Sequence, residues 1–312
     1  MAKHSVSHAD APGQRAMSTG GVGSVGRGRR RRQALQRARR PWWRGPIPLV
    51  GAVVVVLALV GAFVVMAQQG SSSASAQIGQ PASSTIMRAV TSISPSIIAA
   101  VGAGTLSNGA PLPNPLRAIP GPSLTTDGKP QVLYIGGEFC PYCAADRWSL
   151  VNALSRFGAF SNLRYMRSAD DDGDIATLTF SGSGYTSPYV SFVPIENEDR
   201  SHQQLQPLNG EQQQLLSTLG GNGYPFVDIA GQYANDAPKS YPGGYDQSVL
   251  SGKDWLQIAD ALGNTHSPIT QGVVGNANYV TAAICAVTHD RPASACDTPT
   301  IRRIGRQLPK RP

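Results

Sequence analysis

Residues 131–143 read Gln-Val-Leu-Tyr-Ile-Gly-Gly-Glu-Phe-Cys-Pro-Tyr-Cys. The first five form an apolar run typical of a buried strand, and a helical pattern follows from Ala144 to Phe157. The two cysteines, Cys140 and Cys143, therefore stand where a strand passes into a helix. The unpaired N–H groups and the positive end of the helix dipole stabilise a thiolate there, and thiolates attack disulfides. This placement predicts a redox-active pair.

The position of each cysteine along the helix predicts its role. Cys140 lies at the mouth of the helix and is expected to be exposed, whereas Cys143 lies one turn inside and is expected to be shielded. Cys140 would attack the substrate, and Cys143 would resolve the mixed disulfide. Pro141 suits the first helical turn because its missing N–H would have gone unpaired. An inert disulfide and a zinc half-site are the alternatives, and zinc lacks a second Cys or His pair at the usual distance.

The pattern of strands and helices predicts a mixed α/β domain. Strand 131–135, helix 141–157 and strand 163–167 are expected to form a βαβ unit. The segments expected after it are strands at 177–180 and 189–195, a helix that begins after Asn209, a strand at 226–230, and helices at 252–262 and 270–288.

The N-terminal region predicts a membrane anchor. Residues 1–45 hold 11 Lys or Arg and one acid, which leaves a formal charge of −2 on the rest of the +8 chain. This arm is rich in Gly, Ser and Arg without hydrophobic periodicity, so we expect disorder rather than a folded nucleic-acid surface. Residues 46–67 follow with a run of 21 uncharged residues from Ile47, long enough as a helix for a hydrocarbon core of roughly 30 Å.

The arginines before this run place the N-terminus in the cytoplasm, by the positive-inside rule. We therefore expect a single-pass protein of the cell membrane, with a flexible linker at 68–87 and an extracytoplasmic domain at 88–312. A signal peptide cleaved near residues 74–76 is the alternative, but the apolar run exceeds the usual length of such a segment.

All four cysteines lie on the expected extracytoplasmic side, where disulfides persist. Three connectivities exist, and the close spacing of Cys285 and Cys296 favours a structural disulfide between them. The alternatives are a second redox pair that passes electrons to the first, and a metal site that includes His289.

The order strand, Cys-Pro-Tyr-Cys, helix, strand, then helix, Tyr-Pro and strand resembles the thioredoxin superfamily. Residues 132–148, 155–158 (Ser-Arg-Phe-Gly) and 191–194 (Ser-Phe-Val-Pro) resemble a narrower group of prokaryotic membrane-anchored thioredoxin-like proteins of unassigned function. The resemblance implies a thioredoxin-like fold, a mixed central sheet flanked by helices. It also implies Cys140 as the nucleophile, Cys143 as the resolving thiol, and Pro225 as a cis-proline.

These observations predict a membrane-anchored thiol–disulfide oxidoreductase that acts on exported proteins. Its expected substrate-binding residues are Pro141, Tyr142, Tyr224 and Pro225, and it is expected to need no cofactor and no metal. Exported thiol or disulfide proteins are its expected partners, with a membrane-embedded redox partner and without nucleic acid. A peptide-binding or chaperone-like module with structural disulfides, and a metal carrier, are the alternatives. The Pro-Tyr dipeptide between the cysteines does not indicate the redox direction.

Overall fold

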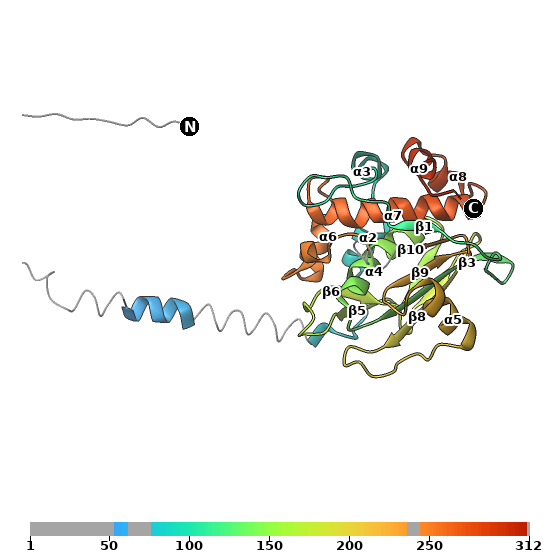
Figure 1. Cartoon of the computed structure of the whole chain (residues 1–312). Coiled ribbons are helices and arrows are strands. Elements are labelled where there is room, and N and C mark those ends of the chain that lie inside the picture. The colour runs from blue at the N-terminus through green and yellow to red at the C-terminus, as the bar shows by residue number, and fades with distance from the viewer. Residues whose placement is uncertain (1–52, 62–75, 236–243, 311–312) are drawn as a thin grey trace, which may run out of the picture. The chain divides into compact units, whose positions relative to one another are not determined.

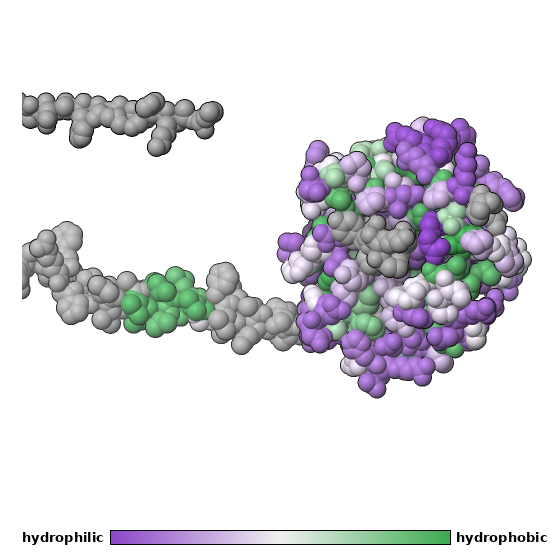
Figure 2. All heavy atoms as spheres, viewed as in Figure 1, coloured by the Kyte–Doolittle hydropathy of each residue, from purple (hydrophilic) through white to green (hydrophobic). Residues whose placement is uncertain are grey.

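The computed structural model of the chain describes residues 53–61, 76–235 and 244–310, in two units, Met1–Gly61 and Ala62–Pro312. In the first unit, residues 53–61 form a helix whose valine and leucine side chains are each at least half exposed, and Figure 2 shows this helix as hydrophobic. The predicted basic arm at 1–45 and most of the predicted transmembrane segment at 46–67 lie outside the described residues. No single described helix has the length and apolarity to cross a membrane; two short helices of the second unit, Ser84–Thr91 and Pro95–Val101, meet these criteria only as a pair bent by 55°.

The strand that precedes the two cysteines is the centre of the main sheet of the second unit. This strand, β3 (Lys129–Gly137), pairs in parallel with β8 (Ser191–Glu198) and antiparallel with β9 (Phe226–Ile229). Beyond β9 the sheet continues through β10 (Tyr233–Asn235) to β1 (Leu116–Ala118), and the short β2 (Thr125–Thr126) pairs with the start of β3. The architecture is a mixed α/β fold, in which a sheet of parallel and antiparallel strands is flanked by helices (Figure 1).

Four further strands form two small sheets: β4 (Ala159–Ser161) with β7 (Gly184–Thr186), and β5 (Arg164–Arg167) with β6 (Ala176–Thr179). The helices are α2 (Ser84–Thr91), α3 (Pro95–Val101), α4 (Pro141–Leu154), α5 (Gly210–Leu219), the 3-10 helix η2 (Gln247–Leu250), α6 (Trp255–Ala261), α7 (Pro268–Val287), α8 (Ala293–Cys296) and α9 (Pro299–Gly305).

Both faces of the main sheet are covered. Alternate side chains of β3 point to opposite faces, so Val132 and Tyr134 join the large core, while Leu133 and Ile135 join a smaller one. Residues of α4 and α7 belong to the large core, and Leu216 of α5 belongs to the small core. Figure 1 shows α7 and α5 on opposite sides of the sheet.

The parallel partner of β3 differs from the prediction. The strand expected at 163–167 exists as β5, but it pairs with β6 in a separate antiparallel sheet. The βαβ unit is closed by β8, so the crossover contains β4 to β7 in addition to α4. The prediction of strand 163–167 as the parallel partner was wrong because β5 and β6 satisfy each other's backbone groups locally.

The folded chain begins earlier than predicted. The Gly79 N–H donates to the Tyr165 carbonyl at 2.8 Å, and α2 buries Ile86 and Val90 in the large core. The predicted linker at 68–87 therefore overlaps the folded unit, and its residues 68–75 lie outside the described part. The uncharged composition before Ser84 predicted a linker, but it does not reveal that the next helix, α2, packs against the core. The buried apolar side chains of α2 explain the difference.

The predicted disulfide between Cys285 and Cys296 is confirmed. It ties the last turn of α7 to α8, with both residues almost fully buried. The bond closes a short loop that contains Pro292, and it anchors the C-terminal helices to the long helix of the core.

We expect replacement of both residues of this disulfide, in Cys285→Ala/Cys296→Ala, to lower the free energy of unfolding by about 3 kcal/mol, the chain-entropy value for so short a loop. Urea denaturation of the full chain followed by circular dichroism measures the change. A midpoint equal to that of the wild type would contradict the stabilising role. Thiol titration confirms that only two cysteines remain.

Candidate functional site

The two cysteines occupy the first turn of α4. Cys140 is the N-cap residue, Pro141 begins the helix, and the Cys143 N–H donates to the Cys140 Sγ at 3.2 Å. The sulfur thus takes the place of the side-chain oxygen that usually caps a helix. Both residues are free thiols here, so the structure shows the motif in its reduced form.

The surroundings shift the pKa values of the two thiols in opposite directions. The hydrogen bond with the Cys143 thiol lowers the pKa of Cys140, and the Cys143 amide and the charge of Arg147 act in the same direction. Burial raises the pKa of Cys143 well above its ordinary value, and the hydrogen bond with Cys140 adds to this rise. Cys140 is therefore the thiol that ionises first, and Cys143 retains its proton.

Cys140 is less exposed than the sequence predicts. Its exposed fraction is 4%, against 0% for Cys143. Cys140 is therefore the more exposed of the two cysteines, as predicted, but the prediction that it is open to solvent was wrong. Cys140 Sγ points back to the amide of the helix and lies 3.9 Å from the carbonyl oxygen of Tyr224. These contacts on two sides explain the small exposure.

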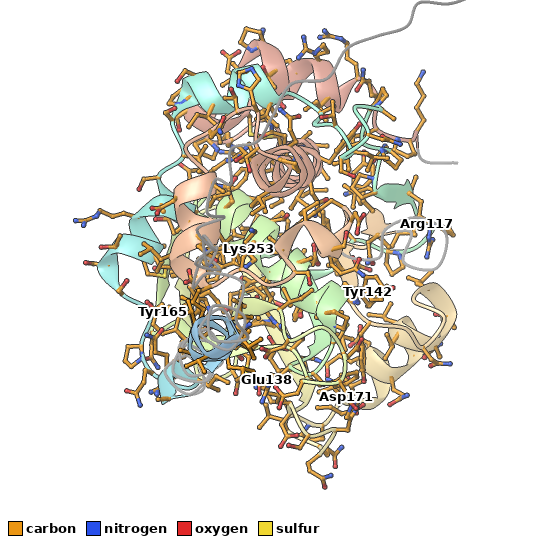
Figure 3. All side chains as sticks on the ribbon, turned by 90° about the vertical axis from the view of Figure 1, so that its left-hand side faces the viewer. Arg117, Glu138, Tyr142, Tyr165, Asp171 and Lys253 are labelled. Carbon is orange, nitrogen blue, oxygen red and sulfur yellow. A yellow bond between two sulfur atoms is a disulfide. The ribbon has the colours of Figure 1, made fainter. Side chains whose placement is uncertain are left out.

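The structure brings the predicted substrate-binding residues to the same place. The Tyr224–Pro225 peptide bond is cis, which confirms this prediction, and Pro225 precedes β9. Tyr224 is half-buried, and its hydroxyl accepts a hydrogen bond from Asn197 Nδ2 at 2.5 Å. Tyr142 is half-buried in the first turn of α4 and is labelled in Figure 3, whereas Pro141 is buried. Of the four residues, Tyr142 and Tyr224 are partly exposed, whereas Pro141 and Pro225 are buried.

Glu138 is buried, although carboxylates are mostly exposed in folded proteins. Its exposed fraction is 6%, and the Thr179 hydroxyl of β6 donates to its Oε1 at 2.5 Å. Burial raises the pKa of Glu138, and the hydrogen bond from Thr179 opposes that rise. Glu138, labelled in Figure 3, directly follows the last residue of β3 and precedes Cys140 by two residues.

A fully buried ion pair lies beneath the motif. Arg147 of α4 donates through Nε to Glu196 Oε1 at 2.9 Å and through Nη2 to Glu196 Oε2 at 2.7 Å. Nη2 also donates to the carbonyl of Gly137 at 2.7 Å. One side chain thus joins α4 to the end of β3 and to β8. Glu196 could not be singled out from the sequence because only the fold brings it near α4.

Asp146 is a second buried carboxylate on α4. Its Oδ1 accepts from Asn276 Nδ2 of α7 at 3.3 Å, and its Oδ2 has no partner among the described residues. Burial raises the pKa of Asp146 to about 7, against a smaller opposing effect of Asn276 and Arg147. No residue pattern in the sequence distinguishes Asp146 from a solvated helix residue.

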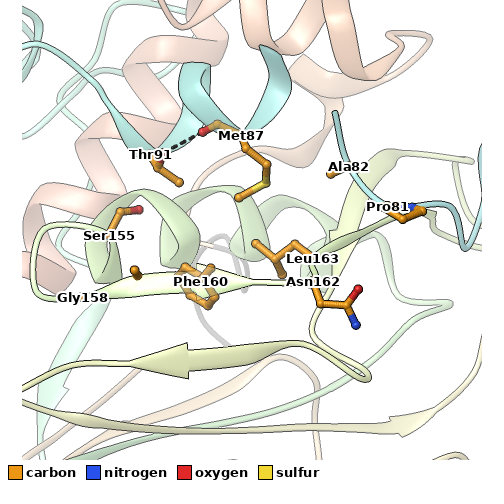
Figure 4. A pocket seen from close by; sticks show the side chains of 10 residues that line it. Pro81, Ala82, Met87, Thr91, Ser155, Gly158, Phe160, Asn162 and Leu163 are labelled. Atoms are coloured by element: carbon orange, nitrogen blue, oxygen red, sulfur yellow. Dashed lines mark hydrogen bonds between the residues drawn. The ribbon is translucent and has the colours of Figure 1, made fainter. Parts of the chain in front are cut away.

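A cavity of about 390 Å³ lies away from the cysteines, between α2 and the segment that follows α4 (Figure 4). Met87 and Thr91 of α2 face Phe160 and Leu163 across it, and the Thr91 hydroxyl donates to the Met87 carbonyl at 2.8 Å. None of its lining residues is a predicted site residue. The described residues also contain no group of three or more His, Cys, Asp or Glu arranged to hold a metal ion.

Residues 118–222 match the model of a family described as a domain of unknown function, DUF929. This stretch contains the two cysteines, Glu138, Arg147 and Glu196, and it ends before Tyr224. The match supports a domain of unknown function over these residues. No curated protein and no solved structure matches the chain.

Replacement of Arg147 by Met leaves Glu196 buried without its cation, so we expect a loss of about 3–5 kcal/mol in the free energy of unfolding. Urea denaturation measures the loss. The double variant Arg147→Met/Glu196→Gln removes both charges and should regain part of it. A loss below about 1 kcal/mol in the single variant, the range of exposed ion pairs, would contradict a structural role for the pair.

Asp146 should make stability depend on pH. Its pKa is raised in the folded chain, so the native state holds this proton more tightly than the unfolded state, and stability falls as pH rises from about 4 to about 7. The free energy of unfolding of Asp146→Asn, relative to that of the wild type, should therefore increase as pH rises through this interval, by on the order of 4 kcal/mol at most. Above about pH 7 this difference should stay constant. Asp260→Asn, at an exposed position of α6, is the matched control. A difference between Asp146→Asn and wild type that is constant with pH would refute the assignment.

Proposed function

We propose that the chain is a thiol–disulfide oxidoreductase in which Cys140 is the nucleophile and Cys143 the resolving thiol. The observation that carries the proposal is the asymmetry of the two thiols. Cys140 Sγ accepts the Cys143 amide at the start of α4 and has a lowered pKa, while Cys143 is fully buried and has a raised pKa. Only the thiolate is nucleophilic, so this asymmetry favours attack by Cys140.

The topology supports a thioredoxin-like fold for this domain. The motif lies between β3 and α4 of a parallel βαβ unit, and the antiparallel strands β9 and β10 and helix α7 follow. The sheet order β8–β3–β9–β10 and the cis Tyr224–Pro225 bond before β9 resemble the thioredoxin arrangement. The small sheets β4–β7 and β5–β6 are additions between α4 and β8.

In the reducing direction, the Cys140 thiolate attacks one sulfur of a substrate disulfide. The substrate S–S bond breaks, a Cys140–substrate disulfide forms, and the other substrate sulfur leaves as a thiolate. Cys143 then loses its proton and attacks Cys140 Sγ, which releases the second substrate thiolate. The substrate has gained two electrons, and the chain holds a Cys140–Cys143 disulfide that a membrane-embedded dithiol donor would reduce. In the oxidising direction, the same bonds form and break in reverse.

The basic arm and the apolar run at 46–67 support the cell membrane as the location, with the domain on the extracytoplasmic side. Exported proteins with thiols or disulfides are then the substrates. Tyr142 and the backbone of Tyr224 are the groups beside Cys140 that such a substrate would contact.

The test uses the full chain and a peptide with one disulfide as substrate. We expect Cys140→Ala to abolish exchange, because it removes the only thiol with a lowered pKa. Cys143→Ser should keep the attack and accumulate the mixed disulfide, seen by mass spectrometry. Cys285→Ala/Cys296→Ala is the matched control and should retain exchange at temperatures at which this variant is still folded.

Full exchange activity in Cys140→Ala would refute the proposal. The reduction potential of the Cys140–Cys143 pair gives a second measure: a value above about −300 mV marks a labile pair, and a lower one marks a structural bridge. The same value, compared with that of the substrate, determines the direction of electron transfer.

A further inference from the structure

A cluster of aromatic side chains surrounds Phe139, the residue that directly precedes Cys140. The ring of His202 lies against the ring of Phe139, with 3.9 Å between the two centroids, and the ring of Tyr224 meets it edge-on at 6.2 Å. Phe139 and Tyr224 are partly exposed, and His202 is exposed. The cluster therefore reaches the surface within one residue of the candidate nucleophile.

Glu198, the last residue of β8, lies between two members of this cluster. The Tyr224 hydroxyl donates to its Oε1 at 3.4 Å, and its Oε2 lies 3.8 Å from His202 Nδ1. The Glu138 N–H donates to the Glu198 carbonyl at 2.9 Å, which holds the backbone of Glu198 against the end of β3. Tyr224 thus extends from the Cys140 sulfur, 3.9 Å from its carbonyl oxygen, to the Glu198 carboxylate at its hydroxyl.

The carboxylate of Glu198 is accessible and has no fixed countercharge. Its side chain is 29% exposed. In the part of the chain that the structure describes, no ion pair joins Glu198 to a Lys or Arg, and its partner His202 is a cation only when protonated. Glu196, two residues earlier in β8, is fully buried and paired with Arg147. A structural carboxylate of this strand thus has an arginine of the chain as its partner, whereas Glu198 has a phenol and an imidazole.

A partly exposed carboxylate among aromatic rings fits a basic side chain. The ammonium of a lysine can pair with the carboxylate and lie over an aromatic ring, while its aliphatic stem packs on the rings. An acidic side chain in the same place would be repelled by Glu198. An uncharged aliphatic side chain would gain the packing alone.

We propose that Glu198 makes the exchange reaction selective for substrates that carry a basic residue next to their reactive cysteine. The inference rests on the proposed function and adds a substrate class to it, namely exported proteins with a lysine or arginine beside the disulfide. When the substrate sulfur reaches Cys140, the basic side chain extends along Tyr224 to the Glu198 carboxylate. Glu198 takes no part in the making or breaking of bonds, and it acts through the affinity for the neighbouring residue.

The test compares two disulfide peptides that differ at one position, next to a cysteine. One peptide has lysine there, and the other has norleucine, which has nearly the same shape without the charge. The second-order rate constant for exchange with the reduced full chain is measured for each peptide at pH 7.5. We expect the lysine peptide to react about three- to fivefold faster, the effect of a partly exposed ion pair, and the excess to shrink as salt is added.

Three variants test the assignment to Glu198. Glu198→Gln should remove the difference between the two peptides. Glu211→Gln, the same substitution at an exposed position of α5, is the matched control and should keep the wild-type ratio. Asp199→Asn removes the neighbouring charge but keeps an oxygen that accepts from the Ser201 and Gln203 amides, and it should change the ratio less than Glu198→Gln does.

The comparison of the two peptides needs no variant, and the side chain of Glu198 is partly exposed, so Glu198→Gln is expected to fold. Equal rate constants with the wild-type chain would overturn the selectivity but leave the proposed function intact, because both peptides still exchange. A lysine preference that survives Glu198→Gln, or that Asp199→Asn lowers equally, would overturn the role of Glu198. Exchange with neither peptide would refute the proposed function and this inference with it.

Discussion

The ion pair between Arg147 and Glu196 fixes the helix that carries the two cysteines. Both side chains are fully buried, and Arg147 reaches the end of β3 and the middle of β8 at once. Removal of either charge would leave the other without compensation in an apolar interior, which is far more costly than the loss of a surface pair. The pair therefore restricts the position of α4 relative to the two parallel strands. The geometry of the Cys140–Cys143 turn depends on that position.

Local features of this region could be predicted from the sequence because they depend on neighbouring residues. An apolar run marked β3, and a proline suited to the first helical turn marked the start of α4. The partner of β3 could not be read in this way. The strand at 164–167 has the right composition, but a short antiparallel partner follows it, and the parallel position is left to β8. Strand pairing depends on contacts across the chain, which one sequence does not display.

The buried charges of the site were missed for a related reason. Charged residues are rarely fully buried unless paired, so nothing in the sequence marks Glu138 and Asp146 as buried groups. Their partners, Thr179 and Asn276, lie in β6 and α7, distant in the sequence. The apolar surroundings also raise the pKa of each carboxyl group, a property that depends on the packed fold. Sequence patterns identified the two thiols at the start of α4, and the fold added the groups around them.

Helix α4 is buried on all sides although much of its sequence is polar. A helix in this position usually carries apolar residues all round, because polar groups lose their water on burial. Here specific partners replace the water: Ser149 donates to the Val273 carbonyl at 3.1 Å, and Asn152 donates to the Val90 carbonyl at 2.7 Å. Such bonds hold the helix in one orientation, since a rotation would leave several polar groups unpaired at the same time. The orientation of the Cys140 and Cys143 thiols at the start of this helix is therefore fixed by bonds made along its whole length.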